Sequence, residues 1–347
     1  MVGFLVISDD LTGANGVAGM MAKHCRTIVV DYSKLSAIGG FNADCIVVNT
    51  RSRMVNSSDA EARVRAVVDY ASSRGLRIGK RIDSALRGNL VGELRPLLNR
   101  VLVVTDTIPE YGRYTENGYT VMGGAKVNIL ERINHRARVM NLSEFINNAR
   151  ELNGVMVVDS RSHDDLTLIA QVVNKYGYVP VDPGPLNAKV SELTVGASPV
   201  RHRACANSVL FIVGSTHENT IRQVERAREA GIRVINLNDV KNTQWGGGDL
   251  IIKFDLLRDI EMVNEYLVKL ALDFDAVMLS GGETANLILS IADASYIEAV
   301  GDVAPLIGIG IVRGGLLDGK VIVTKGGLIG DDEAYLRIRN YLRGQCF

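Results

Sequence analysis

Short apolar runs and amphipathic stretches alternate along this chain from one end to the other. Residues 4–7 predict a buried strand, and residues 12–23 predict the helix that follows it. A second helix is predicted from apolar residues that recur with a period of 3.6, namely Ala60, Val64, Val67, Val68 and Ala71. A capping box at residues 58–61 and a glycine at position 75 are its expected start and stop signals.

The same alternation continues almost to the end of the chain. Ser162 is expected to open another helix, which Gly177 ends. Strands that alternate with helices indicate βαβ units, so we expect an α/β fold with mostly parallel sheets. Further strands are predicted at residues 45–49, 155–159, 209–213, 276–279 and 321–324.

Two domains are expected from the length and from one local change in composition. A chain of 347 residues corresponds to roughly two domains of ordinary size. Prolines and glycines cluster between residues 183 and 207. We therefore place one α/β domain at residues 1–200 and a second at residues 201–347, with a ligand cleft between them. Residues 109–124 fit neither period and are expected to form a long functional or flexible loop.

Composition narrows the class of protein. Hydrophobic residues make up 47% and charged residues 22%, which excludes a disordered chain. The 39 basic and 39 acidic residues cancel, so neither a nucleic-acid surface nor an anionic-membrane surface is expected. No stretch approaches the ~18 apolar residues that a membrane span needs. The four cysteines lack metal or redox spacing and are expected to be thiols in a reducing compartment, which predicts a cytoplasmic location.

The candidate chemistry lies where predicted strands end. In open parallel sheets, ligands bind at the carboxyl ends of the strands. Asp9 and Asp10 follow the first strand, and Arg81 and Asp83 come at the end of a strand near residues 76–82. Carboxylates beside guanidinium groups suit a small, polar, anionic ligand. Each pair also has a plain structural interpretation, a helix N-cap for the first and a surface ion pair for the second.

The second half of the chain offers glycine-rich turns instead. Main-chain N–H groups at a helix start bind phosphate, and glycine lets a ligand approach the backbone closely. An ordinary capped turn is the alternative at each. A match to the nucleotide-binding pattern G-x-x-x-x-G-K is rejected, because Val321 replaces the required hydroxyl residue and a strand follows. The turns are Gly214-Ser215-Thr216, Ser280-Gly281-Gly282-Glu283-Thr284 and Lys325-Gly326-Gly327.

The two halves thus differ in their chemistry. The first presents carboxylates and basic groups, whereas the second presents glycine-rich turns. This division favours phosphoryl transfer from a nucleotide in the second domain to a hydroxyl held by the first. In such reactions, catalysis consists mostly of positioning and charge stabilisation.

Six motifs occur in order along the chain, at residues 9–14, 50–53, 80–89, 109–119, 281–284 and 325–332. Together they resemble the motifs of the four-carbon acid sugar kinase family, the former DUF1537 group. The resemblance implies ATP-dependent phosphorylation of a hydroxyl on a small sugar acid such as threonate, erythronate or 3-oxo-tetronate. It also implies an N-terminal sugar-acid-binding domain and a C-terminal domain that binds ATP with Mg²⁺.

The resemblance also implies which residues line each site. The sugar-acid site would be lined by Asp9, Asp10, Arg51, Asp83, Arg87 and Asn89. Within that site our own hypothesis is that Asp10 accepts or orients the proton of the attacking hydroxyl, with Asp83 as the second catalytic candidate. Arg51 or Arg87 would bind the substrate carboxylate. No residue is assigned to a metal. The nucleotide is expected to contact Gly214, Ser215, Gly281, Gly282, Glu283, Thr284, Gly326 and Gly327.

Other interpretations remain open at this point. A non-catalytic sensor of sugar acids or nucleotides is the main alternative, although sensing does not require a carboxylate at the hydroxyl. An oxidoreductase is disfavoured because no complete G-x-G-x-x-G follows a strand. The expected partners are small molecules, and self-association is left open.

Overall fold

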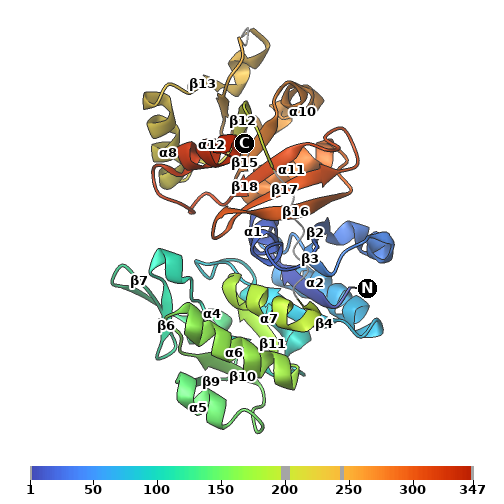
Figure 1. Cartoon of the computed structure of the whole chain (residues 1–347), viewed down its shortest axis with the longest axis vertical. Helices are drawn as coiled ribbons and strands as arrows, with labels where there is room; N and C mark the ends of the chain where they lie inside the picture. The colour runs from blue at the N-terminus through green and yellow to red at the C-terminus, as the bar shows by residue number, and fades with distance from the viewer. Residues whose placement is uncertain (1, 197–203, 243–245, 345–347) are drawn as a thin grey trace.

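The chain folds into two lobes that lie against each other (Figure 1). The computed structural model describes residues 2–196, 204–242 and 246–344. We call residues 2–196 the N-terminal lobe and residues 204–344 the C-terminal lobe. The strands of the N-terminal lobe are β1 Phe4–Ser8, β2 Thr27–Asp31, β3 Cys45–Asn49, β4 Arg77–Arg81, β5 Leu102–Val104, β6 Tyr114–Glu116, β7 Tyr119–Met122, β8 Ala125–Asn128, β9 Ala137–Met140, β10 Val155–Val158 and β11 Val179–Asp182.

The C-terminal lobe begins its sheet at β12. Its strands are β12 Val209–Val213, β13 Arg233–Asn236, β14 Leu250–Lys253, β15 Ala276–Ser280, β16 Tyr296–Ala304, β17 Ile307–Arg313 and β18 Val321–Lys325. The helices of the two lobes are α1 Leu11–Met21, α2 Ser57–Ser73, α3 Leu90–Leu94, α4 Ile129–Ile133, α5 Leu142–Asn147, α6 His163–Tyr176, α7 Pro185–Val195, α8 Glu218–Glu229, α9 Leu256–Asp259, α10 Glu265–Leu270, α11 Gly282–Ile291 and α12 Ala334–Gly344.

One sheet runs through both lobes. Its order is β13-β14-β12-β15-β18-β17-β16-β2-β3-β1-β4-β11-β5-β10-β9. Pairing is parallel on either side of β16 and β17, and these two strands are antiparallel to their neighbours. The predicted α/β class with mostly parallel strands is confirmed. The difference is that β16 pairs with β2, with Ile297 opposite Val29, so the two sheets are continuous.

The strand order places two switch points in this sheet. β1 lies between β3 and β4, and β12 lies between β14 and β15. At such points the loops after adjacent strands leave in opposite directions and open a crevice. The loops after β1, β3 and β4 and those after β12, β14 and β15 are therefore the positions where ligand-binding side chains are expected.

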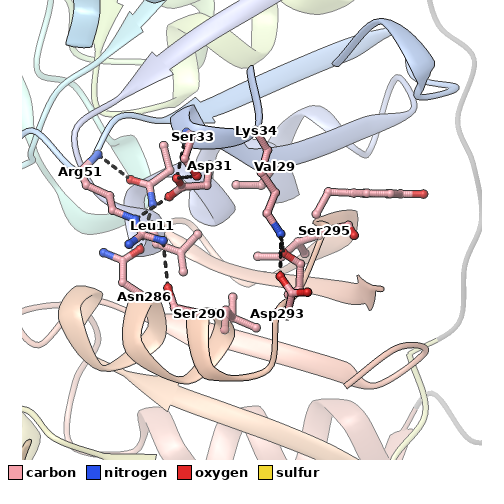
Figure 2. A pocket seen from close by; sticks show the side chains of 15 residues that line it. Leu11, Val29, Asp31, Ser33, Lys34, Arg51, Asn286, Ser290, Asp293 and Ser295 are labelled. Atoms are coloured by element: carbon pink, nitrogen blue, oxygen red, sulfur yellow. Dashed lines mark hydrogen bonds and ion pairs between the residues drawn. The ribbon is translucent and has the colours of Figure 1, made fainter. Parts of the chain in front are cut away.

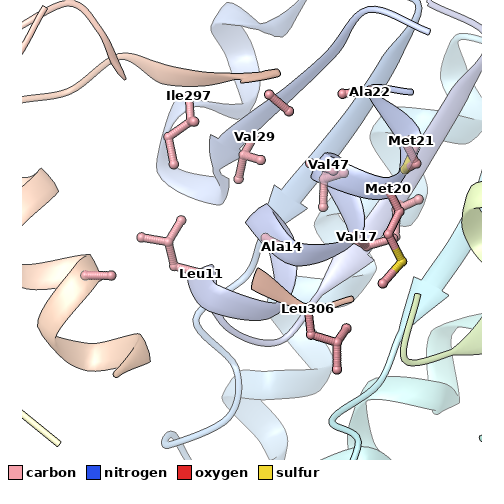
Figure 3. Packing of buried hydrophobic residues seen from close by; sticks show 14 of the residues in the cluster. Leu11, Ala14, Val17, Met20, Met21, Ala22, Val29, Val47, Ile297 and Leu306 are labelled. Atoms are coloured by element: carbon pink, nitrogen blue, oxygen red, sulfur yellow. The ribbon is translucent and has the colours of Figure 1, made fainter. Parts of the chain in front are cut away.

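Helix α1 forms the seam between the lobes (Figure 3). All of its residues are buried, which explains why it is apolar or small on every side. It packs against β16 and β17 of the C-terminal lobe, and a β-carbon on Gly19 would lie only 2.3 Å from the Gly301 carbonyl oxygen. Leu306, at the tip of the β16–β17 hairpin, is buried against the same helix near Gly16. The small residues of α1 thus allow close contact between the lobes.

Several local predictions are confirmed and others need correction. Ser162 and Asp165 form the capping box of α6, and Gly177 ends that helix with a left-handed backbone. The cap of α2 is Asn56 instead of Ser58, because the Asn56 side chain accepts from the Asp59 N–H one turn into the helix. Residues 114–128 are not an irregular loop, since they form the antiparallel sheet β6-β7-β8.

The expected linker is shorter than predicted. Helix α7 occupies residues 185–195, so the first half of the stretch at 183–207 is helical. Residues 197–203, including Pro199, lie outside the described residues. Two cysteines, Cys25 and Cys45, are buried thiols as expected, whereas Cys205 is disulfide-bonded, contrary to the prediction. Among the described helices, none has the length and apolar character needed to cross a bilayer.

Candidate active site

Carboxylates and arginines meet at the carboxyl ends of β1, β3 and β4. Arg53 donates from Nε to Asp9 Oδ2 at 2.7 Å and from Nη1 to Asp10 Oδ2 at 2.9 Å. Arg81 donates from Nη1 to Asp9 Oδ1 at 2.8 Å and to Asp10 Oδ1 at 3.1 Å. All four residues are buried or nearly so, and both acids follow β1 directly. The switch point of the N-terminal lobe therefore holds a paired cluster of two acids and two arginines.

Asp83 extends this cluster on one side. Arg53 Nη2 lies 3.1 Å from Asp83 Oδ1, and the half-exposed Arg87 donates to both oxygens of Asp83 at 2.8 and 3.0 Å. Burial alone would raise the pKa of Asp9 and of Asp83. The arginines outweigh it and hold both pKa values below the ordinary range, which keeps these acids ionised.

Both oxygens of the Asp10 carboxylate accept hydrogen bonds. Its Oδ1 accepts from the Gly13 N–H, Arg53 and Arg81, and its Oδ2 accepts from the Thr12 hydroxyl at 2.6 Å and from Arg53. A carboxylate offers about four acceptor positions, and five hydrogen bonds already use them. A substrate hydroxyl can reach Asp10 only if one donor leaves. Of the two arginines that donate to Asp10, Arg53 lines the cleft and Arg81 does not, so Arg53 is the one that an anionic ligand could draw away in a fork.

Two of the expected substrate residues lie elsewhere. Arg51 turns away from the cluster: its Nε donates to Asp31 at 2.5 Å and its Nη2 donates to Ser290 at 3.0 Å, in a separate 260 Å³ pocket between the lobes (Figure 2). The Asn89 amide donates to the carbonyl oxygens of Ser52 and Val55. Asn89 thus supports the backbone of the loop that carries Arg53.

The cluster forms one wall of a cleft of about 380 Å³ between the lobes. The opposite wall is built from the glycine turns of the C-terminal lobe. A β-carbon on Gly282 would lie 2.7 Å from Asp10 Oδ2, so the acid touches the start of α11. The lining residues are Asp10, Thr12, Arg53, Arg87, Gly214, Ser215, Thr216, His217, Asp255, Leu256, Leu257, Gly281, Gly282, Glu283, Thr284, Gly326, Gly327 and Leu328.

The three glycine turns converge but are not equivalent. Helix α11 begins after Gly281 with no side-chain cap, so its first N–H groups face the cleft unpaired by a cap. Helix α8 is already capped by His217, whose Nδ1 accepts from Asn219 N–H at 3.2 Å. Residues 326–333 connect β18 to α12 as predicted, but this connection is longer than the other two turns, so α12 does not begin at the glycines. The strongest candidate phosphate site is therefore the start of α11.

Close contacts show why the turns require glycine. A β-carbon on Gly214 would lie 2.4 Å from the Thr284 hydroxyl, and one on Gly327 would lie 2.5 Å from the Ser215 hydroxyl. The Thr220 hydroxyl donates to the Gly327 carbonyl at 3.0 Å. The turns after β12, β15 and β18 thus pack directly against one another, and a larger residue would separate them.

A second hollow of about 340 Å³ adjoins the cleft and shares Ser215, Thr216 and Asp255 with it. Its apolar walls are formed by Ile221, Val224, Leu237 and Phe254. Polar side chains line it as well, with Asn236 and Asn238 at the carboxyl end of β13 and Asp259 at the end of α9. An apolar slot with a few polar groups suits a flat heterocycle joined to a sugar.

The residues of this chain could hold a metal ion only together with the phosphates of a bound nucleotide. Among the described residues, no group of three or more His, Cys, Asp or Glu could hold an ion, and Asp9, Asp10 and Asp83 are occupied by arginines. Mg²⁺ commonly binds through one or two carboxylates together with substrate phosphates. Asp255 and Glu283 are the carboxylates that line the cleft outside the arginine cluster. Glu283 lies in the first turn of α11, at the candidate phosphate site, and is therefore better placed to share such an ion.

Arg53 is a central residue that the sequence does not predict, and Arg81 is predicted as a candidate beside Asp83 without a role in the site. Arg53 stands in the same motif as Arg51, two positions later. The signal for Arg53 and Arg81 is the rule that side chains at the ends of neighbouring parallel strands meet. The rule identifies the loop after β3 but cannot choose between its two arginines.

In this α/β protein, a cleft with a charged wall and a helix N-terminus opposite would suit two anionic or polyhydroxylated ligands side by side. A family model described as "Sugar-binding N-terminal domain" matches residues 4–141. D-threonate kinase of Bordetella bronchiseptica is 24% identical over 99% of this chain and 98% of its own. D-erythronate kinase of Heliobacterium modesticaldum is 25% identical over 99% and 97%.

The fold has solved counterparts as well. A Haemophilus influenzae protein of the DUF1537 group has a TM-score of 0.68 at 16% identity, covering 98% of this chain and 99% of its own. These likenesses together support the four-carbon acid sugar kinase family and a phosphotransferase.

Proposed function

We propose that this enzyme transfers the terminal phosphoryl group of ATP to a hydroxyl of a four-carbon sugar acid such as threonate, erythronate or 3-oxo-tetronate. The observation that carries the proposal is the contact between Asp10 and the start of α11. It places a carboxylate that can orient a hydroxyl beside N–H groups that can hold a phosphate. The kinase names of relatives that align over the whole chain support the same reaction.

The sugar acid would bind to the charged wall. Arg53 and Arg87 are the guanidinium groups that line the cleft, so the substrate carboxylate would take one of them in a fork. Withdrawal of Arg53 from Asp10 would leave one acceptor position on Oδ2, beside the Thr12 hydroxyl, for the proton of the attacking hydroxyl. Asp10 is a better base candidate than Asp83, because Asp83 does not line the cleft and holds Arg87 instead.

The nucleotide would occupy the opposite wall. The N–H groups at the start of α11 would hold the terminal phosphates, and the apolar slot beside Ser215 would take the nucleoside. Mg²⁺, when bound with the nucleotide, supplies charge stabilisation at the phosphates, and Glu283 is the residue that would share it.

Replacing Arg53 should affect sugar-acid binding far more than replacing Arg51. Arg53→Ala is expected to raise KM for the sugar acid about 30-fold or more, because truncating one side of a desolvated charge pair costs about 2–5 kcal/mol. Arg51→Ala serves as the matched control and should change KM less than about fivefold, since its pair with Asp31 is partly exposed. Steady-state kinetics with saturating ATP measure both, and a larger effect of Arg51→Ala would assign the carboxylate to the other pocket.

Filling the apolar slot should weaken nucleotide binding selectively. Ile221 lines the slot and is 52% exposed, so Ile221→Trp overfills it without disturbing the core. KM for ATP should rise about 5- to 150-fold, because overpacking costs about 1–3 kcal/mol. KM for the sugar acid should stay unchanged. Leu168→Trp on α6, 42% exposed and outside the slot, is the control. Equal effects of the two variants on KM for ATP would show that the nucleoside does not bind in this slot.

The proposal is tested by ADP release with ATP and Mg²⁺ against threonate, erythronate, their 3-oxo forms and longer aldonates. Turnover on a four-carbon acid supports the proposal and identifies the substrate. If both ligands bind and no acid is turned over, the sensor alternative replaces it. The cytoplasmic location, the restriction to small-molecule partners and self-association remain predictions.

A further inference from the structure

Lys325 is a buried cation that the proposed reaction does not yet use. It ends β18, and its side chain is 0% exposed. Its Nζ donates to the carbonyl oxygens of Gly326 at 2.9 Å and Ile329 at 3.0 Å, and lies 5.6 Å from the centroid of the Tyr335 ring. Across the part of the chain that the structure describes, no carboxylate forms an ion pair with it.

The contrast with Lys80 shows that this is unusual. Lys80 is equally buried, but Glu93 neutralises it at 2.8 Å. A buried charge without a counter-charge is strongly disfavoured unless something compensates it. Carbonyl oxygens solvate the Lys325 ammonium but leave its net charge in place. When Lys325 is protonated, its positive charge therefore has no counter-charge among the side chains of the described residues.

Lys325 also joins the glycine turns at 281 and 326, which belong to the wall of the cleft where the phosphates would bind. We call this wall, formed by Gly281, Gly282, Gly326 and Gly327, the phosphate wall. The Lys325 carbonyl oxygen accepts from the Gly281 N–H at 2.9 Å, which fixes the turn before α11. Its ammonium group holds the loop that begins at Gly326. The lining that the C-terminal lobe contributes to the cleft contains Asp255 and Glu283 but no lysine or arginine. Lys325 is thus the cation of this lobe that lies directly behind the phosphate wall.

We propose that Lys325 is a positioning residue for the phosphoryl donor, which fixes the turns at 281 and 326 and whose charge is balanced by the bound polyphosphate. The inference rests on the proposed function and extends it to a residue outside the lining of the cleft. It predicts that polyphosphate binding and the protonation of Lys325 are linked, since each favours the other.

The surroundings set the direction of this linkage. Burial lowers the pKa of Lys325 to about 7, and no acid contributes to the shift. The groups that face it are Tyr335 from α12, the Ser280 hydroxyl from β15 and, on β17, Ile307 at its paired position. Asp331, further along its own loop, is paired with Arg337 at the surface. A nearby polyphosphate raises the pKa, so binding above pH 7 takes up a proton, and affinity falls as pH rises past 7.

Calorimetry of ADP binding at pH 8, in two buffers of different ionisation enthalpy, tests the linkage on the wild-type enzyme. ADP itself is deprotonated at this pH, since phosphate has a second pKa of about 6. We expect uptake of most of one proton. Lys325→Met should take up none and should bind ADP at least tenfold more weakly at pH 6.5, with threonate affinity unchanged. Lys325→Arg, if it folds, should bind ADP with no pH dependence.

Two results would overturn the inference in distinguishable ways. Wild-type binding of ADP without proton uptake, or uptake that persists in Lys325→Met, removes the role of Lys325 and leaves the kinase proposal intact. Failure of the folded wild-type enzyme to bind ADP at any pH removes the proposed function together with it.

Discussion

Replacing Asp10 by asparagine is expected to lower kcat by about 100- to 10,000-fold, the range found when a positioned acid–base group is lost. The introduced amide oxygen would keep the hydrogen bond from the Gly13 N–H, because asparagine caps helices as well as aspartate does. Helix α1 should therefore still form. What asparagine cannot do is accept the proton of the attacking hydroxyl.

The measurement is kcat with both substrates saturating, well below the melting temperature of the variant. Asp83→Asn is the matched comparison, because Asp83 belongs to the same cluster but holds Arg87 outside the cleft lining. We expect it to raise KM for the sugar acid more than it lowers kcat. Turnover of Asp10→Asn near the wild-type value would show that Asp10 is not the base, and a collapse of kcat in Asp83→Asn would assign the role there.

The second large effect concerns stability. Arg81→Met should lower the free energy of unfolding by about 3–5 kcal/mol, because it leaves Asp9 and Asp10 buried with only Arg53 to compensate them. The guanidinium also packs on α1, where a β-carbon on Gly13 would lie 2.1 Å from its central carbon. Urea unfolding of the wild type and the variant at pH 7 measures the difference.

Arg95→Met is the control for this substitution. Arg95 pairs with Glu61 at 3.2 Å, but it is 52% exposed, so its loss should cost less than about 1 kcal/mol. Equal destabilisation by the two variants would mean that the buried cluster contributes no more than a surface pair. That result would also weaken the case for a strongly held Asp10.

Acid should unfold the wild type and Arg81→Met differently. The pKa of Asp9 is lower in the folded state than in the unfolded chain, where it is about 3.9. The stability that Asp9 contributes is thus fully present above that unfolded-state pKa and is lost as pH falls through the lowered folded-state pKa. Arg81→Met raises that folded-state pKa, so part of the loss is already present at neutral pH. We expect a shallower decline of its unfolding free energy between about pH 5 and pH 3 than in the wild type.

Much of the site could be predicted from strand ends alone. The position of Asp9 and Asp10 after β1 and of Gly281 and Gly282 after β15 follows from apolar runs that stop at turn residues. That both belong to one cleft was expected from the division of chemistry between the halves. The helix α6, with its capping box and terminal glycine, was equally readable because its signals are local.

The choice between Arg51 and Arg53 could not be read from the sequence. Arg51 adopts a left-handed backbone with φ of 49°, which lies outside the regular period after β3 and turns its side chain toward the other lobe. The loop then folds back, and the Arg53 N–H lies 3.3 Å from the Asp9 carbonyl oxygen. Tertiary contacts with α11 and β1 decide both orientations, and no local pattern encodes them.

The sequence also does not indicate that the sheets of the two lobes join through β16 and β2. β16 and β2 lie at opposite ends of the sequence, and only three residue pairs make their junction. Each strand alone is an ordinary edge candidate with no signal of its partner. The sequence predicts the glycine turns but not the difference between them. The His217 cap, which distinguishes α8 from α11, depends on three-dimensional contacts.

We expect a phosphoryl group to move across this cleft from ATP to a four-carbon sugar acid. Phosphorus NMR tests this transfer in a reaction that contains the enzyme, ATP, Mg²⁺ and the acid selected by the substrate panel. A new phosphomonoester signal should grow in equal amount with ADP and should be absent with Asp10→Asn. ADP that accumulates with inorganic phosphate alone, or no change while both ligands are bound, would show that this transfer does not occur.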